Sequence, residues 1–332
     1  MGDLMRATSM RILMTGVTSG IGLDAARRLL AEGHELIVLC RDPERATQRL
    51  GEATDKLQLL QTDLADLTEV HESCRRLLRL NQELDAMVLN AGLQYAGDKR
   101  PRFSAQGIEL TFAVNHLSHQ HIVNQLLPLM TLSNNGRIVI TASEVHNPTS
   151  GGGRVGKPAS LGSLHGLNNG RGFVMVDGST SFDADKAYKD SKLCNLLFAR
   201  QLVAKLNQNQ TAIPVITWSP GLVIPRSSDG FFRYSRQINP LGQLLFAFVA
   251  RDLLRLTVSV ESAGKLLVGL ISRDDLGPGF HYLNNTLKGP GQHQFLDTQT
   301  SPEASDQSLA KDLFERSDEL IRIALKESNT EI

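Results

Sequence analysis

Short apolar runs rich in Ile, Val and Leu alternate with longer segments of helical periodicity along most of the chain. The runs predict strands at about 11–15, 35–40, 57–61, 86–90, 136–141, 214–218 and 280–283. Helices are expected between them at about 20–32, 43–53, 66–80, 105–131, 183–207 and 260–272. Because strands that alternate with helices form βαβ units, we expect an α/β fold with a doubly wound parallel sheet of about seven strands and helices on both faces.

Two segments do not follow this alternation. A Gly-, Pro- and Ser-rich insertion at about 146–182 is long for a loop, and loops of this length are usually functional. The segment at about 225–260 mixes aromatic side chains with leucine and arginine, which indicates either an apolar cover over a pocket or ordinary core helices. A last helix is expected at about 303–327. We expect 1–332 to form a single domain.

Composition and charge exclude several classes of function. The 332 residues hold 35 Lys and Arg against 35 Asp and Glu, so no net charge attracts nucleic acid, and we expect no nucleic-acid partner. The three cysteines are far apart, and His116, His119 and His121 lack further ligands at metal-binding spacing, so we expect no metal site.

Location is predicted from the apolar segments. The N-terminus lacks the apolar stretch of a signal peptide, and the run at 241–250 is too short to span a bilayer. We therefore expect a soluble, cytoplasmic protein. The aromatic and basic side chains of 225–260 also suit contact with a membrane surface.

A glycine-rich turn follows the first strand and precedes the first helix. Close backbone approach and the positive end of a helix dipole favour a pyrophosphate at such a turn, although a purely structural turn is the alternative. The candidate cofactor-binding residues here are Gly16, Thr18, Ser19, Gly20, Ile21 and Gly22.

Three further strand ends carry candidate cofactor contacts. Arg41 follows the second strand, where a cation favours the 2′-phosphate of NADP(H), while Asp42 before Pro43 is typical of a helix N-cap. Asp63 and Leu64 follow the third strand, and Asp63 is expected either to accept from an adenine amino group or to cap the next helix. Small residues end the fourth strand and let a cofactor lie against the sheet: Asn90, Ala91 and Gly92.

The candidate catalytic residues lie in the middle of the chain. Tyr188 and Lys192 have the i, i+4 spacing that places them on one helix face, where an ammonium lowers the pKa of a phenol. Ser143 follows the fifth strand, and Asn115 lies on the preceding helix.

Taken together and in this order, these residues resemble the short-chain dehydrogenase/reductase family. The resemblance implies a Rossmann-type fold that binds NADP(H), with Tyr188 as general acid, Lys192 holding the nicotinamide ribose and lowering the tyrosine pKa, Ser143 orienting the substrate and Asn115 supporting a proton relay. It also implies cofactor contacts at Tyr188 and Lys192 and after the sixth strand, at Pro220, Gly221 and Val223.

The run Lys186 to Asn195 and the long insertion resemble, more narrowly, the light-dependent protochlorophyllide oxidoreductases of cyanobacterial type. That resemblance implies light-driven reduction of a ring double bond of a bulky apolar pigment, in chlorophyll biosynthesis, with a location at thylakoid membranes. One departure is Leu222, because those enzymes carry a cysteine after the Pro-Gly pair. A light-independent reductase of apolar, retinoid-like ketones or aldehydes and a non-catalytic NADPH- or pigment-binding protein are the alternatives. Arg226, Arg233 and Arg236 are expected to pair with substrate carboxylates or to lie on a solvated face.

Overall fold

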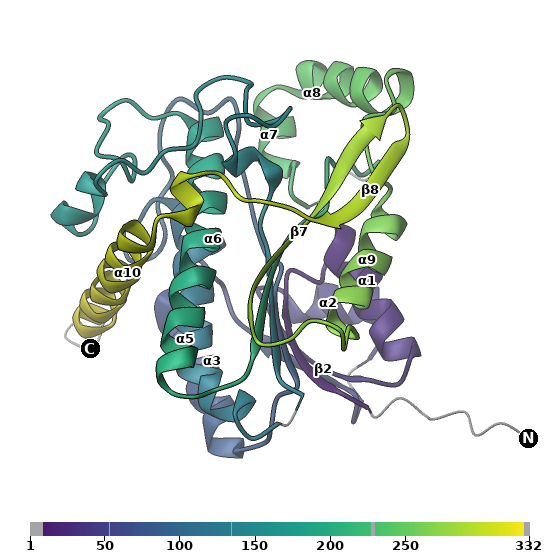
Figure 1. The fold of residues 1–332 in the computed structure, drawn as a ribbon, viewed down its shortest axis with the longest axis vertical. Helices are drawn as coiled ribbons and strands as arrows, with labels where there is room; N and C mark the ends of the chain where they lie inside the picture. Colours follow the sequence, from purple (N-terminus) through teal and green to yellow (C-terminus); the bar gives the residue numbers. More distant parts are fainter. Residues whose placement is uncertain (1–8, 53, 134, 227–229, 329–332) are drawn as a thin grey trace, which may run out of the picture.

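The computed structural model describes residues 9–52, 54–133, 135–226 and 230–328, so the first eight residues, on which the expectation about a signal peptide rests, lie outside it. Its centre is an eight-stranded sheet in the order β3-β2-β1-β4-β5-β6-β7-β8 (Figure 1). The strands are β1 Arg11–Thr15, β2 Glu35–Cys40, β3 Leu57–Gln61, β4 Ala86–Leu89, β5 Arg137–Thr141, β6 Pro214–Ser219, β7 Gly279–Gly289 and β8 Gln292–Asp297.

Strands β1 to β7 are parallel, as expected, and every residue of β4 and β5 is buried. Such strands are covered on both faces, which is why they appear as continuous apolar runs in the sequence. The order reverses between β1 and β4, the position where doubly wound sheets bind their ligands, beyond the carboxyl ends of the strands.

The sequence predicted about seven strands and gave no sign of β8, which pairs antiparallel with β7. Its sequence, Gln292 to Asp297, is mostly polar and exposed, so no apolar run marks it. Strand β7 likewise continues to Gly289, six residues beyond its predicted end, and the chain then reverses through Gly291, whose φ is +72°.

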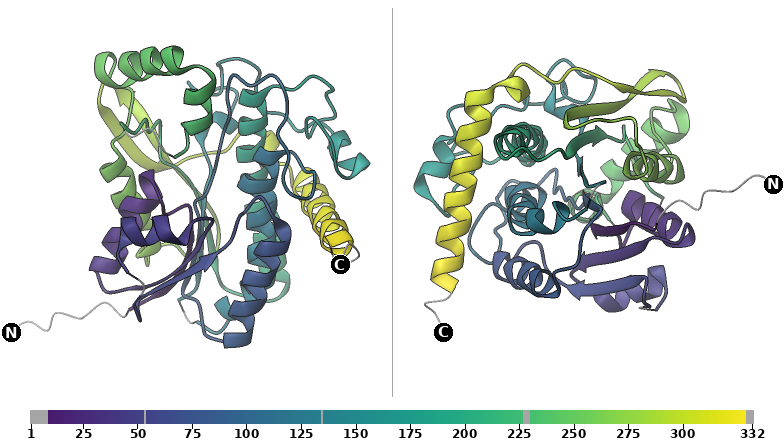
Figure 2. Two further views of the ribbon diagram at one scale, coloured as in Figure 1. Left: turned by 180° about the vertical axis from the view of Figure 1, so that it is seen from behind. Right: turned by 60° about the horizontal axis from the view of Figure 1, so that its bottom comes forward.

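Helices cover both faces of the sheet (Figures 1 and 2). Helix α1 packs against α9 on one face, and α3 packs against α5 on the other, where α10 lies along α6. These helices are α1 Gly20–Ala31, α2 Pro43–Leu50, α3 Leu67–Leu80, α5 Ser118–Met130, α6 Ala184–Gln208, α9 Val260–Ile271 and α10 Gln307–Ser328. A short 3-10 turn, η5 Glu303–Ser305, precedes α10.

The helix predicted at 105–131 is interrupted. It begins only at α4, Leu110–Phe112, where the Glu109 carboxylate caps the backbone N–H groups of Thr111 and Phe112. A π-helical turn, η1 Ala113–Leu117, then leads into α5. The added residue of a π turn breaks the regular hydrogen-bond ladder, and such turns are frequent at functional sites.

The two irregular segments lie toward the carboxyl ends of the strands (Figure 1). The insertion at 146–182 follows the 3-10 turn η2 Glu144–His146 and contains η3 His165–Asn169. The segment at 225–260 forms α7 Arg233–Ile238, α8 Pro240–Ala247 and the π turn η4 Phe248–Leu253. No helix in the described ranges is long and apolar enough to cross a membrane.

Candidate active site

The glycine turn between β1 and α1 is tightly built. A Cβ atom on Gly22 would come within 2.2 Å of the Gly16 carbonyl oxygen, and one on Gly16 within 2.7 Å of Ala91 Cα. Gly20, in contrast, has a φ of +56° and open space where its Cβ would lie. Ser19 occupies the N-cap position of α1, but its side chain accepts no hydrogen bond from the described backbone N–H groups of that helix. The turn therefore presents backbone donors beside free space, as an anion site requires.

The end of β4 is fixed to this turn by hydrogen bonds. The backbone N–H groups of Asn90 and Ala91 donate to the Thr15 hydroxyl over 3.1 and 3.0 Å. The Asn90 side-chain amide donates to the Gly16 carbonyl over 3.2 Å and accepts from the Thr141 hydroxyl, also over 3.2 Å. Asn90 thus connects the glycine turn, β4 and β5.

The other strand ends match the expectations in part. Arg41 is exposed directly after β2, and Asp42 caps α2 by accepting from the Arg45 N–H over 2.9 Å, which confirms its interpretation as an N-cap. Asp63 accepts from the N–H of Ala65, while the cap of α3 is Asp66. The capping alternative for Asp63 is therefore wrong.

Tyr188 lies on α6 beneath the segment at 225–260, which is called the cover segment from here on. Its ring meets the Phe231 ring edge to face with centroids 5.0 Å apart, and the Ser143 side chain lies near its hydroxyl. Burial raises the pKa of Tyr188, and the Ser143 hydroxyl acts against that rise. The net direction is opposite to the expected lowering, because desolvation of the phenolate outweighs the opposing effect of the Ser143 hydroxyl. A raised pKa keeps the phenol protonated, as a proton donor must be.

Lys192 lies one turn further along the same helix face. Its ammonium is 5.7 Å from the centre of the Tyr188 ring and donates to the Thr141 carbonyl over 2.8 Å. Burial lowers the pKa of Lys192 to about 7. A Cβ atom on Gly92 would lie 3.6 Å from both Lys192 Nζ and Asn115 Oδ1, so these residues border one small space.

Asn115 is buried in the π turn and holds the segment after β4. Its Oδ1 accepts from the Leu93 N–H over 2.8 Å, while its amide nitrogen donates to the Leu93 carbonyl and to the Ser191 hydroxyl, each over 3.0 Å. The side chain thereby joins the end of β4 to the helix that carries Tyr188.

The turn after β6 reaches the same region. Gly221 has a φ of +80°, and a Cβ atom there would come within 3.0 Å of the Asn285 carbonyl oxygen. Leu222 packs with an apolar cluster whose buried members are Ile224, Phe232, Ala247 and Ala250. Val223 follows, partly buried. The segment at 225–260 therefore has its own small core, which agrees with the apolar-cover interpretation.

Two lysines on either side of Tyr188 bind the insertion to α6. The Lys186 ammonium pairs with Asp190 at 2.6 Å and Asp177 at 3.0 Å. The Lys189 ammonium donates to three backbone carbonyls of the insertion, those of Gly153, Val155 and Lys157. Helix α6 and the insertion are thus held as one unit.

Several other candidates are engaged elsewhere. Arg226 pairs with Asp252, while Arg233 donates to the Tyr234 hydroxyl and Arg236 to the Pro225 carbonyl. These contacts hold the cover segment together and do not involve Tyr188.

The three histidines near the π turn have separate partners. His116 meets the Ser317 hydroxyl, His119 meets the Thr15 hydroxyl, and His121 meets His71.

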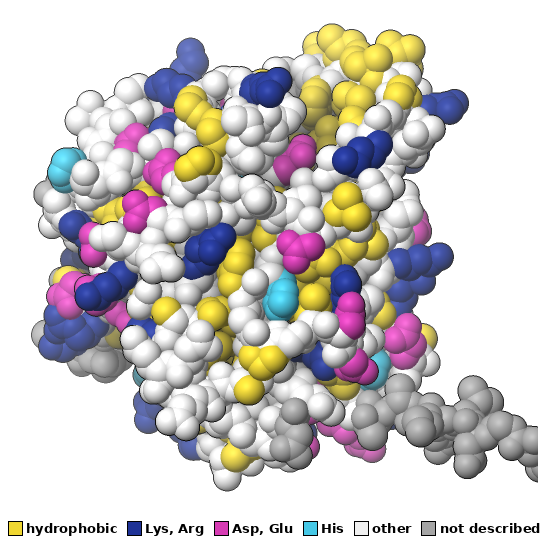
Figure 3. Space-filling view, viewed as in Figure 1, with side chains coloured by type: hydrophobic (Ala, Val, Ile, Leu, Met, Phe, Trp, Pro, Cys, Tyr) yellow, Lys and Arg dark blue, Asp and Glu magenta, His cyan; other side chains and the backbone are white. Residues whose placement is uncertain are grey.

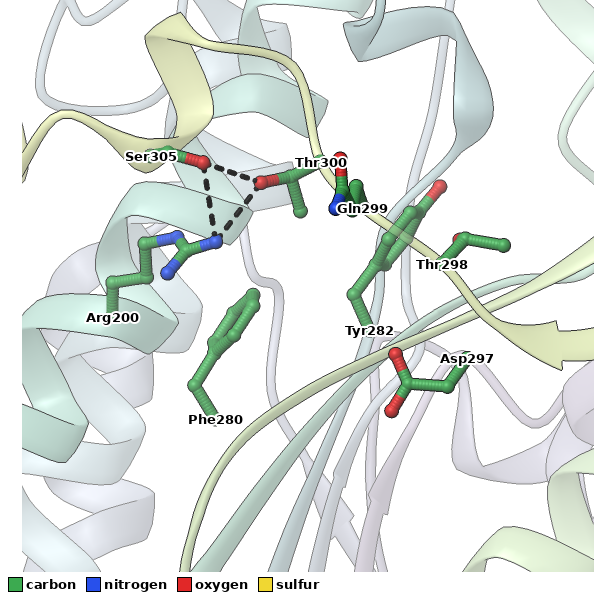
Figure 4. A pocket seen from close by; sticks show the side chains of 8 residues that line it. All are labelled: Arg200, Phe280, Tyr282, Asp297, Thr298, Gln299, Thr300 and Ser305. Carbon is green, nitrogen blue, oxygen red and sulfur yellow. Dashed lines mark hydrogen bonds between the residues drawn. The ribbon is translucent and has the colours of Figure 1, made fainter.

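A cavity of about 270 Å³ opens beside Arg200, whose guanidinium binds the hydroxyls of Thr300 and Ser305 (Figure 4). It also lies against Phe280, Tyr282, Asp297, Thr298 and Gln299. Arg200 follows Tyr188 by three turns of α6, about 18 Å at 1.5 Å per residue. This cavity is therefore separate from the group around Tyr188.

The sequence did not single out Thr141, His119, Lys186 or Lys189 as site residues. Thr141 ends β5 two residues before Ser143, so its place at a strand end was a usable signal. The contacts of His119 with Thr15, of Lys186 with Asp177 and of Lys189 with the insertion join distant segments, so no local pattern marks them.

Comparison with known proteins agrees with this geometry. Residues 10–154 match the family model described as short chain dehydrogenase. The chain is 33% identical over 325 residues to protochlorophyllide reductase B of Oryza sativa subsp. japonica, covering 94% of this chain and 77% of the rice protein. It is 31% identical to the protochlorophyllide reductase of Avena sativa, covering 94% of this chain and all of the oat protein. The chain belongs to the short-chain dehydrogenase/reductase family.

Solved structures support the fold of this family member. An uncharacterized protein from Mycobacterium paratuberculosis superposes with a TM-score of 0.68 at 21% identity, covering 94% of this chain and 93% of that protein. A 3-ketoacyl-(acyl-carrier-protein) reductase from Brucella melitensis, crystallised with NADH, gives 0.55 at 17% identity, covering 84% and 97%. The α/β fold of the short-chain dehydrogenase/reductase family is therefore shown, and the family uses NAD(P)H.

Proposed function

We propose that this chain is an NADPH-dependent reductase of a protochlorophyllide-type pigment, with light driving the reduction of a ring double bond and Tyr188 supplying the proton. The observation that carries the proposal is the position of Tyr188, whose hydroxyl lies near enough to the Ser143 side chain for that group to affect its pKa and whose ring is covered by Phe231. Similarity to protochlorophyllide reductases over 94% of the chain supports the substrate class. The relatives named above are plant proteins, so the cyanobacterial type stays a prediction, as do thylakoid location and a single domain over 1–332.

The residues around the glycine turn fit a dinucleotide. The open space beside Gly20 and the uncapped N-terminus of α1 suit a pyrophosphate, and the small side chains of Ala91 and Gly92 leave room along the sheet. Exposed Arg41 at the end of β2 suits a 2′-phosphate, which supports NADPH over NADH. Asp63 and Leu64 on the adenine side, and Pro220, Gly221 and Val223 on the nicotinamide side, complete the proposed cofactor contacts.

When bound, the dinucleotide supplies a hydride. The protein then supplies one proton: the Tyr188 hydroxyl passes it to the substrate atom next to the one that receives the hydride, so the double bond gains two hydrogens. Ser143 orients the substrate through its hydroxyl, and Lys192 holds its charge close to the phenol that becomes anionic. Asn115 keeps the end of β4 beside this group and supports the return of a proton to Tyr188.

A light-independent reductase of apolar ketones or aldehydes is the second candidate, and Leu222 is the observation that favours it. This side chain packs into the apolar cluster with Ile224 and Phe232, where protochlorophyllide reductases are expected to carry a cysteine. The position therefore adds apolar surface and offers no thiol to a pigment. A non-catalytic pigment carrier is the third candidate.

An absorbance time course separates these candidates. Purified protein is mixed with NADPH and protochlorophyllide, held in darkness and then illuminated. We expect a red-shifted product band only after light, and no such band from Tyr188→Phe, because loss of a positioned acid typically slows a reaction by about 10²–10⁴-fold. The variant Leu222→Cys is the matched probe of the missing thiol, and we expect it to convert pigment at least as fast as the unaltered protein.

Each outcome selects one candidate. Pigment that binds without conversion identifies a carrier. Pigment that neither binds nor reacts, together with dark NADPH oxidation by apolar ketones or aldehydes, identifies the carbonyl reductase. Conversion that is undiminished in Tyr188→Phe overturns the assignment of the acid.

We also propose that α8 and η4 contact a membrane surface. Large apolar side chains gather over α8, at the top of Figure 3, with exposed fractions from 44% for Phe246 to 79% for Leu241. The exposed set is Leu241, Leu244, Leu245, Phe246, Phe248, Leu253 and Leu254. Arg226 and Arg255 are both exposed and lie in the same cover segment. Their positive charges suit anionic headgroups.

Co-sedimentation with phosphatidylglycerol vesicles tests this contact. We expect the unaltered protein to bind these vesicles and the double variant Leu241→Ser/Leu244→Ser to bind them less. We also expect weaker binding of the unaltered protein to neutral phosphatidylcholine vesicles. Binding that is unchanged in the double variant would reject a lipid contact. A change from dimer to monomer in that variant would instead identify a second copy of the chain as the cover.

A further inference from the structure

We propose that His119 is a positioning residue that connects the glycine turn to the Asn115 carbonyl through a hydrogen-bond chain of fixed direction. The functional part of this inference rests on the proposed reductase activity, while the direction of the chain follows from the contacts alone. His119 lies on α5, and only 1% of its surface is exposed, so the ring makes its hydrogen bonds to protein groups.

The Thr15 hydroxyl determines the direction. Its oxygen accepts two hydrogen bonds, from the N–H groups of Asn90 at 3.1 Å and Ala91 at 3.0 Å. A hydroxyl oxygen has two lone pairs and one proton, so only the proton remains for a third partner. That partner is His119 Nε2, 3.1 Å away. Nε2 must therefore accept, and it carries no proton.

The second ring nitrogen then carries the proton. His119 Nδ1 lies 3.2 Å from the Asn115 carbonyl oxygen, which can only accept. The ring is thus a neutral imidazole with its proton on Nδ1, donating to Asn115. Burial and the nearby charge of Lys192 lower the pKa of His119 to about 3, which agrees with a neutral ring.

The position of the Asn115 carbonyl indicates what the hydrogen bond from His119 Nδ1 does in the structure. Asn115 lies in the π turn, where the helix ladder departs from the regular i to i+4 pattern, and His119 Nδ1 gives its carbonyl a side-chain donor. The Asn115 side chain and Lys192 Nζ border the same space at Gly92. His119 therefore keeps the π turn, and with it the surroundings of Lys192, in register with the turn proposed to hold the pyrophosphate.

Two variants separate the two ends of the chain. His119→Gln can place an amide oxygen near the position of Nε2, which keeps the acceptor for Thr15 and removes the donor to Asn115. His119→Asn can place its amide nitrogen near Nδ1, which keeps the donor and removes the acceptor. We expect kcat to fall about tenfold in His119→Gln with the KM for NADPH nearly unchanged, and the KM to rise about fivefold in His119→Asn with kcat nearly unchanged, since one hydrogen bond is lost in each.

A spectrum of the unaltered protein tests the direction without any activity. In a ¹⁵N–¹H correlation spectrum of protein with labelled histidine, the signals absent from His119→Gln belong to His119. We expect Nδ1 to show the shift of a protonated nitrogen and Nε2 that of an unprotonated one at pH 7. A proton on Nε2, or on both nitrogens, would overturn the proposal.

The kinetics of the two variants and the histidine spectrum test different parts of the proposal, so one can fail while the other holds. Equal losses of kcat and cofactor affinity in both variants would show a merely structural role and would overturn the positioning role. If the protein neither binds NADPH nor turns over substrate, the reductase proposal fails, and the spectrum still decides the direction of the chain.

Discussion

Gly230 of the cover segment lies directly against Ser19 of the glycine turn. A Cβ atom on Gly230 would come within 2.8 Å of the serine hydroxyl oxygen, and the φ of this glycine is +85°. The next residue, Phe231, meets the ring of Tyr188. Two consecutive residues therefore join the two ends of the proposed cofactor site.

The first prediction concerns this contact. We expect Gly230→Ala to raise the KM for NADPH roughly five- to tenfold, because the new methyl group displaces the cover from the turn at a cost of about 1–2 kcal/mol. Steady-state kinetics with varied NADPH measure it. In a Ser19→Ala background the hydroxyl is gone, so adding Gly230→Ala there should have a smaller effect. Equal effects in both backgrounds would attribute the loss to backbone strain alone.

The second prediction concerns Lys189 and the insertion. Lys189→Met removes the donor that binds the carbonyls of Gly153, Val155 and Lys157. We expect the insertion to open more often and trypsin to cleave at Arg154 about tenfold faster, because a hydrogen bond from a charged donor contributes about 1.5–3 kcal/mol. Mass spectrometry of limited digests identifies the site.

The control for this change is Lys265→Met, which removes an exposed lysine of α9 on the other face of the sheet. It should leave the cleavage rate at Arg154 unaltered. An equal rate in Lys189→Met and in the unaltered protein would show that other contacts hold the insertion.

The third prediction concerns cofactor choice. Arg41→Gln should raise the KM for NADPH about tenfold and leave the KM for NADH nearly unchanged, since only the 2′-phosphate loses its cation. Kinetics with both cofactors measure the ratio. Arg75→Gln, which changes an exposed arginine of α3, is the control for a change in net charge. Loss of affinity for both cofactors alike would argue against contact with the 2′-phosphate.

The fourth prediction concerns acid stability. Burial lowers the pKa of His116 and His119 to about 3 and that of His121 and His146 to about 4, from an ordinary value of 6.5. Between these values the unfolded chain binds protons that the folded chain does not. Stability from these groups is therefore complete above pH 6.5 and lost as the pH falls toward 4, by at most about 1.4 kcal/mol per histidine and pH unit.

Urea unfolding at a series of pH values measures this slope. His116→Gln should reduce the proton uptake on unfolding by about one near pH 5, because one titrating ring is removed. An unchanged slope would show that His116 is protonated in the folded protein.

The sequence by itself determined the parallel strands and the order of the chemical groups. Strands β4 and β5 are buried on both faces, so β4 and the centre of β5 are continuously apolar and are visible as such in the sequence. The glycine turn and the spacing of Tyr188 and Lys192 are local features, because a turn and one helix face depend only on neighbouring residues. The capping role of Asp42 was equally local and was predicted for that reason.

The tertiary structure decided what depends on contacts between distant segments. The edge strand β8 forms because β7 offers it hydrogen-bonding groups, whereas its own residues are polar. The π turn at Asn115 interrupts a segment whose periodicity is that of a continuous helix. The net pKa of Tyr188 rises because the cover and the sheet together remove water, and that burial is a property of the assembled fold. The partners of His119 and Lys189 are set in the same way, since long-range packing alone brings a ring to Thr15 and an ammonium to the insertion.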